Sequence, residues 1–263
     1  MEPIKVVVHG AAGRMGREVV SAVCREVDLT PVGAADAVLE PGFYPLPDGS
    51  GSVPQSNALQ DVVDGADVVV DFSVADATMN AMRVASAHKV NMVVGTTGIT
   101  DANLREADSL AREHDVGIIV APNFAMGAVL MIHLARVAAP FFDYVDLTEM
   151  HHEAKIDAPS GTALAIARAA VDGKGDGFTS PPAEKETLAG TRGGVQEGVN
   201  IHSARMPGRM AHHELVFGAL GQTLTIRHDS INRESFMPGV VMAVRQVVRS
   251  KGLTVGLENI MGL

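Results

Sequence analysis

The sequence predicts an α/β protein, with a doubly wound parallel sheet in the N-terminal half followed by an α+β domain with a mixed or antiparallel sheet. Three observations support this class. Short β-branched runs alternate with helical stretches over the first 121 residues. A glycine-rich turn follows the first run, and three strand-like runs succeed one another directly after residue 199. Strands separated by helices form parallel sheets through right-handed crossovers, whereas strands in direct succession form antiparallel or mixed sheets.

The N-terminal half begins with a strand over 4–9, whose contiguous apolar residues are typical of a strand buried on both faces. A helix over 14–27 follows, because apolar residues recur every four positions from Met15 to Val27. The segment 41–56 is rich in Pro, Gly and Ser, and we expect a loop there. The remaining expected strands are 29–35, 67–72, 91–95 and 117–121, and the expected helices are 76–88 and 101–114.

The pattern changes after residue 124. A long apolar helix is expected over 127–142, and 173–198 forms a loop of a length that is usually functional or mobile. A last helix, 236–249, is suited to return to the first domain. The predicted domains are therefore 1–124 with 235–263, and 125–234. In the second domain the expected strands are 145–150, 200–205, 214–218 and 223–228, and the expected second helix is 162–171.

Charge and composition exclude several functional classes. The 263 residues contain 21 Lys and Arg against 31 Asp and Glu, a net charge of −10 without any basic run, which argues against nucleic acid and membrane partners. The single cysteine, Cys24, excludes internal disulfides and thiolate zinc clusters and indicates a reducing compartment. Without a signal peptide or a long apolar segment, the expected location is the cytoplasm, or a reducing compartment such as the plastid stroma after processing.

A glycine-rich turn between the first strand and the first helix predicts dinucleotide binding in a Rossmann-type domain. Glycines let the backbone approach a pyrophosphate, which the first N–H groups of the helix bind. The spacing is G-x-x-G-x-x-G, with Ala12 at the usual middle glycine, and Asp36 lies 20 residues past Gly16 for the ribose hydroxyls. The residues of the turn expected to contact the cofactor are Gly10, Ala11, Ala12, Gly13, Arg14 and Met15. A glycine turn of purely structural use is the alternative.

The cofactor is expected to be NADH, with NADPH as the alternative. Asp36 repels a 2′-phosphate, and residues 37–40 offer no Arg or Lys to bind one, so that Arg14 alone could compensate. Ligands of such sheets bind at the carboxyl ends of the strands, and Asn123 is a suitable partner for the nicotinamide carboxamide. The strand ends expected to line the site are 71–73, then Gly95, Thr96 and Thr97, then Ala121, Pro122, Asn123 and Phe124.

The densest chemistry lies in residues 149–162, which predict a pocket for an anionic substrate beside a proton donor. His151 and His152 supply imidazoles, and Lys155 adds an ammonium group. Ser160 is a typical helix cap, and the free N–H groups of Gly161 and Thr162 suit a carboxylate. The alternative is a capped helix after a polar turn, with surface histidines.

Other sites and classes are less favoured by the sequence. No metal site is expected, because adjacent histidines on a strand point to opposite faces and no H-E-x-x-H motif is present. His212, His213 and Glu214 are expected to pack or to face a neighbouring subunit. Another NAD(P)-dependent dehydrogenase acting on a small carboxylate stays open, although Cys24 lies within a helix and cannot be the nucleophile of a semialdehyde dehydrogenase. A redox sensor without activity is a third class.

The string H-H-x-x-K-x-D-A-P-S-G-T at 151–162, with the glycine turn and the strand ends above, resembles the dihydrodipicolinate (4-hydroxy-tetrahydrodipicolinate) reductase family over nearly the whole chain. The resemblance implies NAD(P)H-dependent reduction of a small cyclic dicarboxylate, on the diaminopimelate route to lysine. It also implies a first domain completed by the C-terminal helix and a second whose sheet builds a homotetramer. The implied roles are acid/base for His151, proton donor for Lys155, substrate binding for His152, Ser160, Gly161 and Thr162, and cofactor binding for residues 10–15, Asp36, 95–97 and 121–124.

Overall fold

The computed structural model describes residues 2–263. The chain divides into two compact units, Met1–Met126 with Arg233–Leu263, and Gly127–Asn232. The first unit contains an eight-stranded, mostly parallel sheet between helices, and the second contains a five-stranded mixed sheet. The predicted fold class is therefore confirmed.

The sheet of the first unit brings the predicted strand ends to one edge. Its strand order is β13-β7-β6-β5-β1-β2-β4-β3, and every neighbouring pair is parallel except β3 with β4. Val6–Val8 and Val68–Val70 are fully buried, as expected for central strands covered on both faces. The strands are β1 (Ile4–His9), β2 (Leu29–Ala35), β3 (Gly42–Pro45), β4 (Ser52–Ser56), β5 (Val68–Asp71), β6 (Asn91–Val94), β7 (Gly117–Val120) and β13 (Gly252–Val255).

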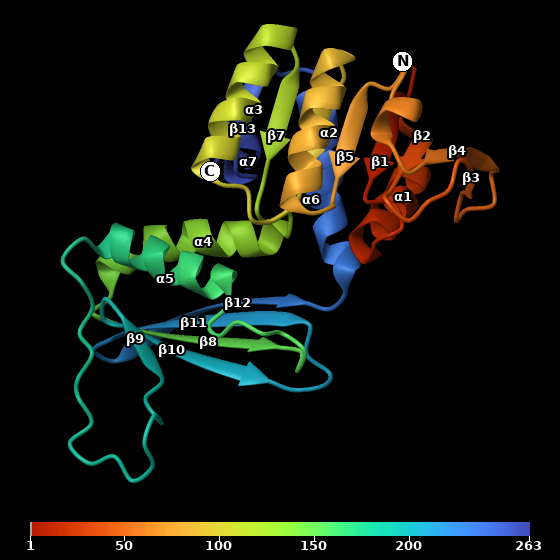
Figure 1. Cartoon of the computed structure of the whole chain (residues 1–263). Coiled ribbons are helices and arrows are strands. Elements are labelled where there is room, and N and C mark those ends of the chain that lie inside the picture. The colour runs from red at the N-terminus through yellow and green to blue at the C-terminus, as the bar shows by residue number, and fades with distance from the viewer. Residues whose placement is uncertain (1) are drawn as a thin grey trace. The chain divides into compact units, whose positions relative to one another are not determined.

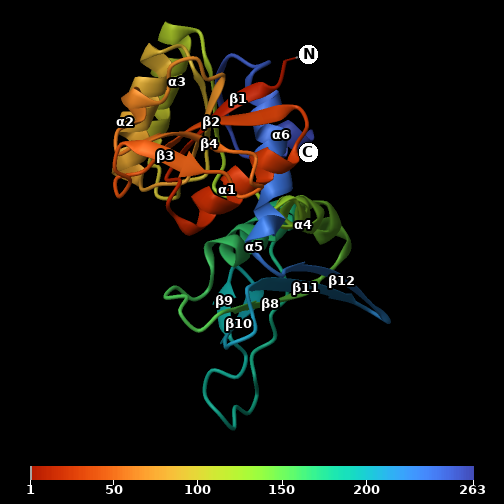
Figure 2. The same cartoon turned by 90° about the vertical axis from the view of Figure 1, so that its right-hand side faces the viewer.

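Helices cover both faces of this sheet (Figures 1 and 2). In Figure 2, α2 (Ala75–Ala87) and α3 (Asp101–His114) lie on one side of the strands, and α6 (Met237–Val247) lies on the other. Helix α6 packs against α1 (Arg14–Arg25), so the C-terminal segment completes the first unit. Arg245 fixes this arrangement, because its guanidinium donates to Asp28 and Glu26 in the α1–β2 turn at 2.6 Å each.

Two predictions in the first unit were wrong, and two elements were not predicted. The expected loop 41–56 contains β3 and β4, which form a hairpin whose second strand pairs with β2 at the sheet edge. The predicted helix 14–27 ends at Arg25, because Glu26 is extended, and Val27 is 97% exposed instead of buried. The elements that the sequence does not predict are β13 and the short α7 (Glu258–Met261). The local pattern there is weak, and β13 forms through its pairing with β7.

The second unit has two helices on one face of a mixed sheet, as Figure 1 shows. The strand order is β12-β11-β8-β10-β9, with β10 parallel to β8 and the other pairs antiparallel. Apolar side chains of the helices and strands, including Met131, Ile166 and Leu215, form its buried core. The elements are α4 (Met126–Ala138), β8 (Tyr144–His151), α5 (Gly161–Lys174), β9 (Gly194–Gln196), β10 (Val199–Arg205), β11 (Ala211–Ala219) and β12 (Gln222–Ser230).

Two boundaries in the second unit also differ from prediction. The long helix expected over 127–142 ends at Ala138 and continues as a 3₁₀ turn, Ala139–Phe141. Pro140 accounts for this, because it has no N–H for the helical ladder. The expected loop 173–198 contains β9, a three-residue edge strand paired with β10. Within residues 2–263, no helix combines the length and apolar character that crossing a bilayer requires.

Candidate active site

The glycine turn after β1 has the backbone shape that a pyrophosphate requires. Gly10 has a φ of +80°, and a Cβ added there would lie 2.6 Å from the carbonyl oxygen of Phe72. A Cβ at Gly16 would lie 2.0 Å from the carbonyl oxygen of Gly10, so α1 starts directly against the turn. Gly13 caps α1 without a side-chain hydrogen bond, which leaves the first N–H groups of the helix available. The turn therefore fits a dinucleotide.

Asp36, at the end of β2, borders this turn. Its carboxylate accepts hydrogen bonds from the N–H groups of Ala12 at 3.1 Å and of Val38 at 3.2 Å. Tyr44 of β3 donates to the carbonyl oxygen of Ala11 at 3.2 Å. A cavity of about 620 Å³ lies alongside, lined in part by Gly10, Gly13 and Asp36. The β3–β4 hairpin thus supports the glycine turn through Tyr44.

A second cavity, of about 290 Å³, is lined by the loops after β5, β6 and β7. Asn123 accepts a hydrogen bond from the N–H of Ala125 through Oδ1, so its Nδ2 is the atom free to donate to a ligand. The predicted cofactor residues that line this cavity are Met15, Gly95, Thr96, Thr97, Pro122, Asn123 and Phe124. Neither cavity is lined by Ala11, Ala12, Arg14 or Ala121; Ala11 and Ala121 are fully buried, and Arg14 is exposed.

A buried carboxylate organises the strand ends of the first unit. Asp71 is fully buried and accepts hydrogen bonds from His9 Nδ1 at 2.5 Å, Ser73 Oγ at 2.7 Å, and the hydroxyls of Thr78 and Thr96 at 2.6 Å each. Burial raises the pKa of Asp71, but the hydrogen bonds, first that from His9, outweigh it and hold the pKa below its ordinary value. Because Ser73 and Thr96 line the second cavity, Asp71 fixes part of its wall.

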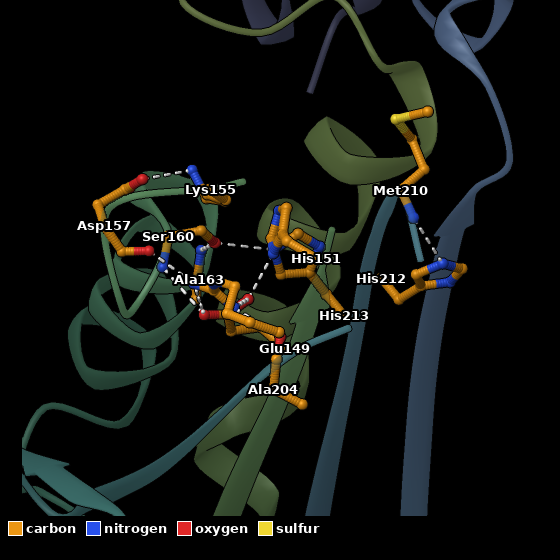
Figure 3. A network of polar contacts seen from close by, with 11 residues as sticks. Glu149, His151, Lys155, Asp157, Ser160, Ala163, Ala204, Met210, His212 and His213 are labelled. Carbon is orange, nitrogen blue, oxygen red and sulfur yellow. Dashed lines mark hydrogen bonds and ion pairs between the residues drawn. The ribbon is translucent and has the colours of Figure 1, made fainter. Parts of the chain in front are cut away.

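In the second unit, β8 ends in the predicted imidazole pair. His151 is its last residue and is 7% exposed, whereas His152 follows the strand and is partly exposed. The ring of His151 contacts Glu149 through Nδ1, 2.5 Å from Oε2. Arg205, the register partner of His151 on β10, holds the same carboxylate with Nη1 and Nη2 at 2.9 and 2.8 Å. Figure 3 shows this network.

The turn before α5 lies against this network. Ser160 caps α5 as predicted, because its hydroxyl accepts a hydrogen bond from the N–H of Ala163 at 3.1 Å. The same hydroxyl contacts His213 Nε2 at 3.1 Å, and the Ser160 N–H donates to Glu149 at 3.3 Å. A Cβ added at Gly161 would lie in open space, so the first N–H groups of α5, those of Gly161 and Thr162, border an accessible surface.

Lys155 lies in the loop between β8 and α5. Its Nζ donates to Asp157 Oδ1 at 2.7 Å, and its side chain is 23% exposed against 59% for that of Asp157. The contact lowers the pKa of the Asp157 carboxyl. An exposed pair of this kind contributes at most ~1 kcal/mol to stability, so Lys155 can exchange Asp157 for another carboxylate.

Three further polar residues of the second unit lie in this network: Glu149 and His213 are buried, and Arg205 is partly buried. Glu149 lies two positions before His151, and alternation along a strand places both on one face, which is a signal that the sequence contains. Arg205 and His213 are 54 and 62 positions from His151 and reach it only through strand pairing. His213 was expected to pack, and it does: it is 3% exposed.

Groups of three or more His, Cys, Asp or Glu side chains that could hold a metal ion are absent from residues 2–263. The several acidic and imidazole side chains of the second unit instead pair with one another or with arginines. Glu149 binds His151 and Arg205, and Asp229 binds His212 and Arg227.

Comparison with known proteins agrees with this geometry. The curated 4-hydroxy-tetrahydrodipicolinate reductases of Dehalococcoides mccartyi and Cutibacterium acnes are 49% and 46% identical to the chain, over 100% and 99% of both sequences. A solved structure of dipicolinate-bound dihydrodipicolinate reductase from Paenisporosarcina sp. TG-14 has a TM-score of 0.87 at 38% identity, over 98% of this chain and 99% of that one. The family models of the dihydrodipicolinate reductase N-terminus and C-terminus match residues 4–124 and 127–261. The chain therefore belongs to the dihydrodipicolinate reductase family.

Proposed function

We propose that this protein reduces 4-hydroxy-tetrahydrodipicolinate to tetrahydrodipicolinate with a reduced nicotinamide dinucleotide, on the diaminopimelate route to lysine. The observation that carries the proposal is the end of β8, where His151 is held by Glu149 directly before the open N-terminus of α5. This arrangement joins an acid to an anion-binding surface, as the reduction of a cyclic dicarboxylate requires. The relatives named above support the same reaction.

The first unit binds the dinucleotide. The N–H groups at the start of α1 bind the pyrophosphate, Asp36 binds the ribose hydroxyls, and Asn123 Nδ2 orients the carboxamide. The bound reduced nicotinamide supplies the hydride. The remaining proposed contacts are Gly10, Ala11, Ala12, Gly13, Arg14, Met15, Gly95, Thr96, Thr97, Ala121, Pro122 and Phe124.

The second unit binds the substrate and supplies the proton. One carboxylate of the ring accepts from the N–H groups of Gly161 and Thr162, and Lys155 leaves Asp157 to bind the same dicarboxylate. His152 adds a contact, and Ser160 holds the start of α5 in place. Reduction at C4, after the 4-hydroxyl has left, places electron density on C3 of the ring. Nε2 of His151 gives C3 its proton, because Nδ1 is occupied by Glu149.

Asp36 makes NADH the preferred cofactor. We expect Asp36→Ala to raise the KM for NADH about 10- to 100-fold, the loss of hydrogen bonds to a charged group, and to raise the KM for NADPH less, because the carboxylate that repels a 2′-phosphate is gone. Steady-state kinetics with both cofactors measures this. Asp48→Ala, in the exposed β3–β4 turn, is the control. Equal increases in the KM values for the two cofactors would contradict a contact between Asp36 and the ribose. Asp36 would then serve only to hold the N–H of Ala12 in the glycine turn.

The assembly is proposed to be a cytoplasmic homotetramer built through the sheet of the second unit. Leu220 and Leu224 on β11–β12 are 102% and 39% exposed in the single chain, an apolar surface that a neighbouring copy would cover. Sedimentation equilibrium of the purified protein would give the mass of the assembly.

The function is tested by steady-state kinetics with NADH and NADPH against the enzymatically generated cyclic imine. Oxidation of either cofactor that depends on this substrate supports the proposal. Pyridine-2,6-dicarboxylate, a planar mimic of the substrate, is expected to inhibit and to alter the fluorescence of bound NADH. Activity with another small carboxylate and none with the cyclic imine would favour a different dehydrogenase.

A further inference from the structure

We propose that Glu149 and Arg205 form a clamp that holds the His151 ring in a single tautomer and orientation, which makes both of them positioning residues for proton transfer. The inference rests on the proposed function, in which His151 is the acid. Its basis is the set of hydrogen bonds around Glu149, a residue whose side chain is fully buried. Glu149 therefore acts through His151 and not on the substrate.

Both oxygens of Glu149 are fully used. Oε2 lies 2.5 Å from His151 Nδ1 and 2.9 Å from Arg205 Nη1, and Oε1 lies 2.8 Å from Arg205 Nη2 and 3.3 Å from the Ser160 N–H. Arg205 is anchored in turn, since it donates to the carbonyl oxygens of Ala204 at 2.8 Å and Asp157 at 2.6 Å. In Figure 3, Glu149 lies between His151 and the turn that carries Ser160. The clamp thus ties three segments, β8, β10 and the start of α5, to one carboxylate.

This geometry determines which nitrogen of His151 exchanges its proton. A carboxylate only accepts hydrogen bonds, so the proton on Nδ1 stays on the ring and points at Glu149. Nε2 is then the atom that loses and regains a proton during turnover. Burial raises the pKa of Glu149, but the hydrogen bonds from His151 and Arg205 outweigh it and lower the pKa to about 2. Arg205 thereby keeps Glu149 ionised, so the carboxylate remains an acceptor for the N–H at Nδ1 of His151.

A second imidazole lies against the His151 ring. His213 on β11 meets the His151 ring edge-on, with centroids 5.4 Å apart. Burial, and then repulsion from His151, lower the pKa of His213 to about 4, so it is neutral near pH 7. Glu149 supplies the negative charge in direct contact with the imidazole.

The test compares Glu149→Gln with the wild type, with pH profiles of kcat and kcat/KM. The amide keeps the shape of the side chain but removes the charge. We expect kcat to fall about 10²-fold, as positioning residues of catalytic histidines show, with KM for NADH unchanged. The loss of activity at high pH is expected to begin at least about one pH unit lower, because the ring then contacts a neutral amide in place of a carboxylate. Glu149→Asp restores the charge, so the pH at which its activity begins to fall should lie closer to that of the wild type.

Asp146→Asn is the matched control, because Asp146 lies on the same strand and forms an exposed pair with His202 at 3.3 Å. It is expected to leave kcat and the pH profile unchanged. Two results overturn the clamp if the Glu149→Gln protein is folded, with normal thermal unfolding and NADH binding. One is turnover equal to that of the wild type. The other is a low kcat whose loss at high pH begins at the same pH as in the wild type.

A measurement without turnover separates the clamp from the proposed reaction. In ¹⁵N NMR spectra of the wild type, the neutral His151 ring should carry its proton on Nδ1. The opposite tautomer overturns the clamp even in an active enzyme. A wild type that does not reduce the cyclic imine but has the Nδ1 tautomer contradicts the proposed reaction and leaves the clamp standing.

Discussion

His151→Ala is expected to lower kcat by about 10²- to 10⁴-fold, the range typical for removal of a general acid. The KM for the dicarboxylate should change little, because the proposed carboxylate contacts come from Gly161, Thr162 and Lys155. The side chain of His151 is 9% exposed and contacts Glu149 with one nitrogen only, so its removal takes away the proton donor and little binding surface. Steady-state kinetics with saturating NADH and varied substrate separates the two constants.

Lys155→Ala supplies the comparison. The ammonium group of Lys155 is the proposed partner of a substrate carboxylate, so its loss should raise the KM of the substrate as well as lower kcat. The two variants therefore differ in how the loss divides between kcat and KM. Unaltered turnover in both variants would refute the assignment of the acid, and a raised substrate KM in His151→Ala alone would reverse the proposed roles.

The parts of the fold that the sequence predicted are those encoded locally. Contiguous apolar runs identified β1, β5, β6 and β7, and the glycine turn identified the start of α1 at Arg14. The strands that were missed depend on partners. Hairpin β3–β4 has only Val53 and Ser56 buried, and it exists because β4 pairs with the edge of β2. Val27 continues the apolar stripe of α1 in sequence, yet the chain has already turned away from the helix.

The candidate site also contains a part that the local sequence predicts and a part that depends on strand pairing. Residues 151–162 follow one another in the chain, so their pattern alone predicted the cap at Ser160. The groups that hold those residues come from other strands. Arg205 reaches Glu149 because β10 pairs with β8. His213 reaches Ser160 from β11, which pairs with β8 on its other side. A single sequence without strand pairing cannot predict such contacts.

The Asp71 network in the first unit should control both stability and cofactor binding. We expect Asp71→Ala to lower the free energy of unfolding by about 3–5 kcal/mol, because four buried or partly buried donors lose their acceptor. Asp71→Asn should cost about 1–2 kcal/mol, since the amide retains one acceptor oxygen and hydroxyls can reorient. Both variants should weaken NADH binding, about 10-fold for Asn, through displaced Ser73 and Thr96. Urea unfolding and NADH fluorescence titration measure these effects.

Asp64→Asn is the control for this prediction. It removes a carboxylate that contacts His88 at 2.6 Å, the same kind of pair as Asp71 with His9, but the Asp64 side chain is 85% exposed. Such a pair contributes no more than ~1 kcal/mol, so stability and NADH binding should be unchanged within that limit. Equal losses in Asp64→Asn and Asp71→Asn would contradict a role for burial in the Asp71 network.

The pH dependence of the Asp71 effect follows from its lowered pKa. The ionised carboxylate is favoured in the folded state, so its stabilisation is complete above the unfolded pKa of about 3.9 and is lost as the pH falls through the lower folded value. The stability difference between wild type and Asp71→Asn should therefore shrink only below about pH 4. A difference that instead shrank as the pH rose from 5 to 8 would mean that Asp71 is protonated in the folded protein, and the four hydrogen bonds would need another assignment of donors.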